Sequence, residues 1–317
     1  MSFNNSISNN ISNNIFNNMQ NYRHEEYQYI NLIENIIENG EWEEGRNGKT
    51  KCIFGASMRF TLKNGTIPIL TTKKTAWKTC LKELLWFIRG ETDAKKLQNQ
   101  GVHIWDGNTT REFLDSRGLH LYPEGMIGPS YGYQWRNFGA SYNCFTGTNL
   151  TDDHPFSGVD QLQYIVEQLK NHETRNSRRL IMTAWNPKQL DQMALPPCHI
   201  LCQFRVKNGN QLSCALFQRS NDCALGTSFN IASYSFLTHL LAKHCGLEAC
   251  EFIHFMGDCH LYEEHIEPMK NILDMVPFEF PKVFIKQTRE NIGEYIVEDF
   301  EVTKYECHEP IKMKMVA

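Results

Sequence analysis

The chain has 317 residues, of which 41% are hydrophobic, and a formal net charge of −4. This is enough for one large domain with a sizeable core, and the acidic balance gives no general basis for nucleic-acid binding. No run of about 18 apolar residues and no signal-peptide pattern occurs, so we expect a soluble, cytoplasmic protein that does not bind membranes. Eleven cysteines without a C-x-x-C pair do not indicate a disulfide framework, and no metal-ligand spacing appears, so we predict no metal.

The chain is predicted to consist of a tail and one domain. Nine of the first 22 residues are asparagine, so we expect residues 1–26 to be a disordered tail and residues 27–317 to form a single domain. Helices and strands are mixed without a regular βαβ alternation. We therefore predict an α+β fold, in which helices pack on a large, mixed, twisted sheet.

The predicted elements follow from the spacing of apolar residues. Helices are expected over 78–89, 159–169 and 230–245, with Ser157-x-x-Asp160 as a capping box and Gly246 as the cap of the third helix. Glu83 lies among apolar residues of the first helix and is either a surface residue or an acid with a raised pKa. Strands are expected over 58–62, 180–185, 251–256 and 282–285, together with a hairpin over 200–217.

The hairpin carries the strongest chemical signal. Asn208-Gly209, flanked by alternating strand-like residues, is typical of a two-residue turn. With that turn and no bulge, Cys198 and Arg219 are cross-strand neighbours, and a fixed cation favours the nucleophilic thiolate. The alternative is a buried structural cysteine with an arginine at the sheet rim. His199 is not expected to act as the base for Cys198, because consecutive strand residues face opposite ways.

Two further groups are candidates for ligand binding. Arg178-Arg179 precedes a strand and is either a solvated loop or a phosphate clamp. Asp258, His260 and Tyr262 alternate, so in an extended segment all three point the same way. They either bind sugar hydroxyls or form a half-buried polar strand edge.

Nine ordered motifs follow one another along the chain. They are Glu83-Leu84-Leu85-Trp86-Phe87, Ile104-Trp105-Asp106, Tyr131-Gly132-x-Gln134-Trp135-Arg136, Arg178-Arg179, Ala184-Trp185-Asn186-Pro187, Leu195-Pro196-Pro197-Cys198-His199, Gln218-Arg219-Ser220, Phe229-Asn230-Ile231-Ala232-Ser233-Tyr234 and Gly257-Asp258-x-His260-x-Tyr262. Together these motifs resemble the thymidylate synthase family, and the resemblance extends from about residue 27 to the last residue. It implies a thymidylate synthase-like fold and the reductive methylation of dUMP to dTMP. The carbon and hydride donor is then 5,10-methylenetetrahydrofolate, dihydrofolate is released, and Cys198 adds to carbon 6 of the uracil ring.

The resemblance also implies residue roles, which we list by ligand. Catalytic roles fall to Cys198, Glu83, Tyr131, Arg219, Asn108 and Asp222. The nucleotide is expected at Arg46, Arg178, Arg179, Arg219, Ser220, Asn221, Asp222, Asn230, His260 and Tyr262. The folate is expected at Ile104, Trp105, Asp222, Leu225, Gly226, Phe229, Tyr262, Met315 and Val316, with the C-terminal residues closing over the ligands. The resemblance further implies an obligate homodimer, in which Arg178 and Arg179 reach the partner's site.

Some positions depart from the family pattern, and two other functions remain open. Asn221 replaces a usual glycine or cysteine, Ala76 replaces a histidine or aromatic residue, the phosphate loop 46–50 is unusual, and 141–157 is longer than usual. One alternative is a pyrimidine nucleotide hydroxymethylase of the same fold. A deoxycytidylate version is expected to carry aspartate at position 230, so Asn230 argues against it, and Trp105 favours hydride transfer over water attack. The other alternative is a catalytically silent family member that binds RNA or a protein.

Overall fold

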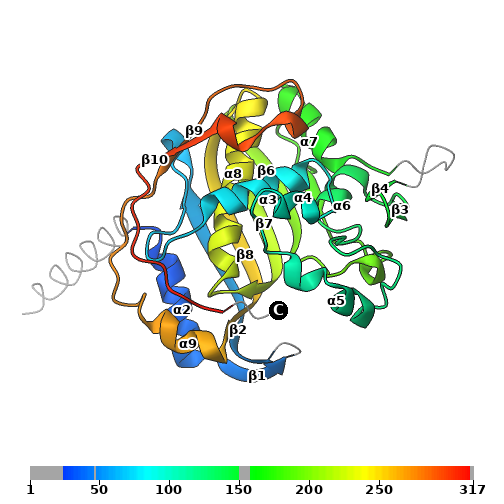
Figure 1. Cartoon of the computed structure of the whole chain (residues 1–317). Helices are drawn as coiled ribbons and strands as arrows, with labels where there is room; N and C mark the ends of the chain where they lie inside the picture. The colour runs from blue at the N-terminus through cyan, green and yellow to red at the C-terminus, as the bar shows by residue number, and fades with distance from the viewer. Residues whose placement is uncertain (1–23, 46–47, 150–157, 315–317) are drawn as a thin grey trace, which may run out of the picture.

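The computed structural model describes residues 24–45, 48–149 and 158–314 (Figure 1). Its centre is a six-stranded sheet in the order β1-β2-β8-β7-β6-β5. The strands are β1 (Glu41–Gly45), β2 (Gly48–Thr61), β5 (Ile181–Thr183), β6 (His199–Lys207), β7 (Gln211–Asp222) and β8 (Glu248–Tyr262). Neighbouring strands are antiparallel except β7 and β8, which are parallel. The sheet is therefore mixed, and the predicted α+β fold is confirmed.

Helices cover one face of this sheet. The long helix α8 (Gly226–His244) is buried along almost its whole length, between the sheet and α3 (Trp77–Ile88) (Figure 1). The remaining helices are α2 (Tyr27–Asn39), α4 (Lys95–Gln98), α5 (Arg111–Ser116), α6 (Gly132–Asn137), α7 (Gln161–Lys170) and α9 (Glu263–Lys270). Two small ribbons pair β3 (Tyr142–Asn143) with β4 (Thr148–Asn149) and β9 (Lys282–Ile285) with β10 (Phe300–Thr303). Among the described helices, none combines the length and apolar character needed to cross a bilayer.

The folded part begins before residue 27. Glu26 is completely buried, and its carboxylate accepts hydrogen bonds from the backbone and hydroxyl groups of Thr71 and Thr72, at 2.7 to 2.9 Å. A buried carboxylate needs such donors to replace water. Glu26 therefore belongs to the domain rather than to the predicted tail, of which residues 1–23 lie outside the described residues.

The helix ends differ from the prediction where polar side chains cap them. Asp160 is itself the N-cap of α7, since its carboxylate accepts the N–H of Gln163 at 2.9 Å, whereas Ser157 lies outside the described residues. Helix α8 begins at Gly226, four residues before the predicted start, because the Asp222 carboxylate turns the chain by accepting two backbone N–H groups. Gly246 follows the end of α8 with φ +68°, as a glycine cap requires.

Strands β2 and β8 are longer than predicted. The predicted strands cover only the last residues of β2, from Met58, and the middle of β8, which continues through Asp258 and His260 to Tyr262. The register pairs Cys52 of β2 with His260. The polar end of β8 is extended because the neighbouring strands β2 and β7 pair with it on both sides, which side-chain polarity alone does not show.

The hairpin pairs Cys198 with Arg219 for a reason other than the predicted one. Residues 208–210 form a three-residue loop, so the pairs from Lys207↔Gln211 to Leu201↔Phe217 are shifted by one position from the predicted register. A bulge between His199 and Leu201 reverses this shift. The N–H of Arg219 consequently donates to the carbonyl of Cys198 at 2.9 Å. The predicted turn was wrong, but the predicted neighbours are adjacent.

Candidate active site

A pocket of about 420 Å³ opens on the helix-covered side of the sheet, around Cys198. The predicted residues that line it are Glu83, Ile104, Trp105, Asn108, Tyr131, Cys198, Arg219, Ser220, Asp222, Gly226, Asn230, His260 and Tyr262. They come from the residue before β6, from β7 and β8, from the start of α8, and from α3 with the loops that follow it. Leu195, His199 and Gln218 also line the pocket, although no ligand role was predicted for them. All three could have been predicted to line the pocket, because Leu195 and His199 lie in the motif that contains Cys198, and Gln218 lies in the motif that contains Arg219.

Arg219 is held rigidly beside the thiol. Its guanidinium donates to the carbonyl oxygens of Pro196 and Pro197, both at 2.9 Å, and lies 5.5 Å from the centre of the Trp185 ring. One of its terminal nitrogens is 3.9 Å from the Cys198 Sγ. This arrangement fixes a positive charge next to the nucleophile before any ligand binds.

The net effect on the thiol is nevertheless opposite to the prediction. Burial raises the pKa of Cys198, while the Arg219 charge and a hydrogen bond with Tyr131 oppose that rise only in part. Desolvation penalises a buried thiolate more than one cation at 3.9 Å favours it. The Cys198 side chain therefore holds its proton more tightly than a free cysteine does.

Tyr131 connects Cys198 to the loop before α6. Its hydroxyl accepts the Cys198 N–H at 2.9 Å, and its backbone has φ 37°, a conformation that non-glycine residues rarely adopt. The next residue is Gly132, where a Cβ would lie 2.3 Å from the Phe87 carbonyl oxygen. Close packing of this loop against α3 thus holds the tyrosine at the pocket.

Glu83 places a buried carboxyl group in the pocket wall. It accepts a hydrogen bond from the indole Nε1 of Trp105 at 2.8 Å. Burial raises its pKa to about 7, against which that hydrogen bond acts only weakly. A carboxyl group that titrates near neutral pH is suited to both giving and taking a proton.

Asn230 lies in a network of uncharged groups. Its Nδ2 donates to the His199 Nε2 at 2.8 Å and to the Gln218 Oε1 at 3.2 Å. Burial lowers the pKa of His199 to about 4, so this imidazole is neutral at physiological pH. The Asn230 Oδ1 makes no hydrogen bond with the described residues.

His260 and Tyr262 form the far end of the pocket. Their rings lie 5.4 Å apart, edge to face, and the His260 Nδ1 is 2.5 Å from a carboxylate oxygen of Asp258. The backbone carbonyl of Lys314 lies 2.8 Å from the Nε2 of His265, whose ring neighbours Tyr262. The described end of the chain therefore lies close to this side of the pocket.

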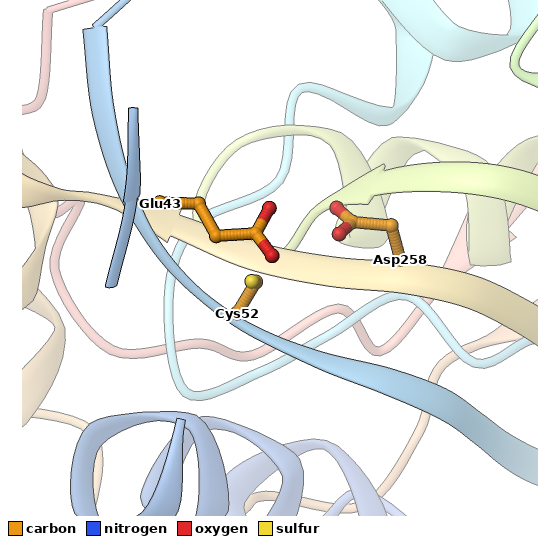
Figure 2. Close-up of side chains that lie close together, drawn as sticks. All are labelled: Glu43, Cys52 and Asp258. Carbon is orange, nitrogen blue, oxygen red and sulfur yellow. The ribbon is translucent and has the colours of Figure 1, made fainter. Parts of the chain in front are cut away.

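Asp258 also belongs to a cluster of possible metal ligands. Figure 2 shows its carboxylate near the Cys52 thiol and the Glu43 carboxylate, which come from three adjacent strands, and the donor atoms lie within 4.8 Å of one another. Burial and the two acids raise the pKa of Cys52 to about 11. Two carboxylates and a protonated thiol do not by themselves establish a metal site, so the absence of a metal stays a prediction.

Several predicted site residues lie elsewhere. Asn221 is completely buried, and its amide donates to the Thr227 hydroxyl at 2.8 Å and accepts from Gln218, so the prediction that its side chain meets the nucleotide is wrong. Leu225 and Phe229 flank Gly226 at the start of α8 but do not line the pocket. Arg178 lines a larger hollow of about 980 Å³ on the other face of the sheet, and Arg179 follows it in the chain. Arg46, Met315 and Val316 lie outside the described residues.

Comparisons with known proteins agree with the motifs. A family model described as thymidylate synthase matches residues 27–317. A probable thymidylate synthase of Schizosaccharomyces pombe is 50% identical over 303 residues, which cover 92% of this chain and 47% of that protein. Bifunctional dihydrofolate reductase-thymidylate synthases of Leishmania amazonensis and Paramecium tetraurelia are 49% and 48% identical over 294 residues, covering 92% of this chain and 55% and 61% of theirs. The chain spans about half the length of these relatives. Since the family match covers the whole domain with its pocket, the chain belongs to the thymidylate synthase family.

Proposed function

We propose that the chain methylates dUMP to dTMP, with 5,10-methylenetetrahydrofolate as the donor of carbon and hydride and dihydrofolate as the second product. The observation that carries this proposal is the pocket in which Cys198, Arg219, Glu83 and Asn230 meet. These four groups supply a nucleophile, a fixed cation, a proton carrier and a reader of the uracil edge. Membership of the thymidylate synthase family supports the same reaction.

In the proposed mechanism the Cys198 sulfur adds to carbon 6 of the uracil ring. The thiol gives up its proton to water in the pocket as it adds, and the Arg219 charge at 3.9 Å stabilises the sulfur anion in that step. Carbon 5, made nucleophilic by this addition, then attacks the methylene carbon of the folate iminium ion, whose C=N electron pair passes to the folate nitrogen. Glu83, with Asn108 and ordered water, moves protons at the uracil oxygen, because its pKa of about 7 permits both protonation states. Removal of the carbon 5 proton near Tyr131 expels tetrahydrofolate and leaves an exocyclic methylene on the ring. Hydride transfer from tetrahydrofolate then completes the methyl group, breaks the bond between Cys198 and carbon 6, and leaves dihydrofolate and dTMP.

The remaining pocket residues are proposed to bind the two substrates. Arg46, Arg219 and Ser220 hold the phosphate, and His260 and Tyr262 bind the ribose. Asn230 presents its free Oδ1 to the ring N–H of uracil. The folate is proposed to lie along Ile104, Trp105, Asp222, Leu225, Gly226 and Phe229, under the C-terminal residues Met315 and Val316. The contact of Lys314 beside α9 supports that placement of the C-terminus.

We also propose an obligate homodimer that forms through the open face of the sheet. Ile181, Phe217 and Phe255 are each more than 40% exposed, so this face carries large apolar side chains on strands β5, β7 and β8. Apolar surface on a sheet favours association with a second copy. Arg178 lines the hollow on that face, from which Arg178 and Arg179 of the partner subunit would reach the phosphate. A cytoplasmic location is proposed as well, since all eleven cysteines are free thiols.

The test is an absorbance assay for dihydrofolate with dUMP and methylenetetrahydrofolate. We compare the wild type with Cys198→Ser and with Cys144→Ser, which changes a partly exposed thiol outside the pocket. Dihydrofolate formation that is lost only in Cys198→Ser supports the proposal. Consumption of dUMP without dihydrofolate favours the hydroxymethylase, which Asn230 and Trp105 argue against. No turnover by the wild type contradicts the proposal and favours a silent binding protein.

A further inference from the structure

His254 is a completely buried histidine behind the pocket, and the proposed mechanism does not use it. It lies on β8, where alternate residues Phe252, His254 and Met256 face the helix-covered side of the sheet and are all buried. Its Nε2 is 2.8 Å from the side-chain Oε1 of Gln218. Its Nδ1 is buried and makes no hydrogen bond with the described residues. An orphaned buried polar atom is uncommon and calls for a reason.

The direction of the Gln218 amide follows from a backbone group. The Gln218 Nε2 lies 2.9 Å from the carbonyl oxygen of Ser220, and a carbonyl only accepts hydrogen bonds. The nitrogen end of the amide must therefore face Ser220, and the oxygen end faces His254 and Asn230. It follows that the His254 Nε2 carries the proton and donates to Gln218. Its Nδ1 is then a bare lone pair, which accounts for the orphaned atom.

The same reasoning fixes the amide of Asn230. The Gln218 Oε1 is 3.2 Å from the Asn230 amide and can only accept, so the nitrogen of Asn230 faces it. The second hydrogen of that nitrogen donates to the His199 Nε2 at 2.8 Å. Both hydrogens are thus used inside the protein, and the Asn230 Oδ1 faces the pocket as an acceptor. An acceptor fits the ring N–H of uracil, whereas the matching ring nitrogen of cytosine carries no hydrogen.

We infer that His254 is a positioning residue that holds Gln218, and through it the Asn230 amide, in the direction that selects uracil over cytosine nucleotides. His254 does not touch the nucleotide. It supplies a second donor to the Gln218 Oε1. A reversed Gln218 amide would place an N–H against the Nε2–H of His254 or force the imidazole proton to Nδ1, where the described residues offer it no acceptor. The inference rests on the proposed function, because it concerns which nucleotide the same pocket binds.

Two substitutions separate this role from simple packing. The amide nitrogen of a glutamine at position 254 can occupy the place of the imidazole Nε2, whereas that of an asparagine corresponds to Nδ1. His254→Gln therefore keeps a donor for Gln218, and His254→Asn removes it while leaving a polar residue of similar kind. We would measure the affinities of dUMP and dCMP for the full chain by calorimetry, after checking by circular dichroism that each variant is folded.

The quantity that decides is the ratio of the two affinities. We expect His254→Asn to lower the preference for dUMP about five- to tenfold, the value of one hydrogen bond, and His254→Gln to keep it within about twofold. Equal losses of affinity for both nucleotides in His254→Asn would indicate packing alone and overturn the inference. A wild type without preference for dUMP contradicts the proposed function itself, which is a distinct result.

A second measurement tests the protonation of His254 in the wild type and therefore does not depend on whether a variant folds. The ¹⁵N chemical shifts of a histidine ring distinguish a protonated nitrogen from a bare one. For His254 we expect a protonated Nε2 and a bare Nδ1 across neutral pH. Protonation at Nδ1 would place a lone pair against the Gln218 oxygen and would overturn the inference.

Discussion

Replacing Glu83 by glutamine should change the pH dependence of stability more than it changes stability at low pH. Burial raises the pKa of Glu83 from its usual 4.5 to about 7. Below pH 4.5 the carboxyl is protonated in the folded and the unfolded chain, so the fold keeps its full stability. As the pH rises through 7, the unfolded chain has already released this proton, and the folded chain must hold a buried carboxylate. This difference in pKa corresponds to about 3 kcal/mol of unfolding free energy, most of which is lost between pH 5 and pH 8.

The assay is urea unfolding of the wild type and Glu83→Gln at pH 5, 6, 7 and 8. One protein concentration is used throughout, because the proposed homodimer would unfold in a concentration-dependent way. Glutamine stays neutral and still accepts the Trp105 hydrogen bond. The stability of Glu83→Gln relative to the wild type should therefore increase by about 2–3 kcal/mol from pH 5 to pH 8. The control is Glu112→Gln, an exposed residue of α5, which should follow the wild type. Parallel curves for the wild type and Glu83→Gln would refute the argument that burial controls this carboxyl group.

Three further substitutions test single contacts. Arg219→Gln removes the cation beside Cys198, so the pKa of the thiol should rise further. Alkylation of Cys198 at pH 8, measured by mass spectrometry, should therefore slow about tenfold for each unit of that rise. An unchanged alkylation rate would contradict this. Glu26→Gln replaces one of the two carboxylate oxygens that accept from Thr71 and Thr72 by an amide nitrogen, which cannot accept. It should destabilise the protein by about 2–4 kcal/mol in urea, whereas an unchanged midpoint would show that these bonds contribute little. Gly132→Ala places a Cβ 2.3 Å from a carbonyl oxygen and should lower both the stability of the protein and its affinity for dUMP. The control is Gly246→Ala, whose Cβ would lie in open space at φ +68°. This control should cost only about 1 kcal/mol of unfolding free energy and leave the affinity for dUMP unchanged.

The sequence was most informative where periodicity and motif coincide. Asp258, His260 and Tyr262 alternate in the sequence, and in the structure His260 and Tyr262 line the pocket while Asp258 contacts His260. Alternation does not explain the position of Asn221, because Gln218, Arg219 and Ser220 follow one another on β7 and all line the pocket. The structure buries Asn221 completely, which neither alternation nor the family comparison predicted.

Other features were beyond sequence reasoning because they depend on packing between distant segments. The position of Tyr131 at the Cys198 N–H follows from the contact of Gly132 with α3, which joins residues 45 positions apart. The bulge between His199 and Leu201 leaves no local signal in composition, yet it restores the register that the three-residue loop had shifted. The prediction missed both the third loop residue and the bulge, and these two one-residue errors cancel. Either error alone would have separated Cys198 from Arg219 in the prediction.

Burial of the site residues is the property that most changes the protonation states expected from the sequence. It raises the pKa of Cys198 and of Glu83 and lowers that of His199, so all three groups favour their neutral forms. Cys198 consequently retains the proton that the sequence-based argument would have removed, whereas Glu83 can give and take its proton near neutral pH. Arg219 stays charged beside them, held by two proline carbonyls. A nucleotide phosphate that enters such a pocket meets a cation not yet neutralised by a thiolate, and the proposed addition to carbon 6 then moves the thiol proton only when the ring is in place.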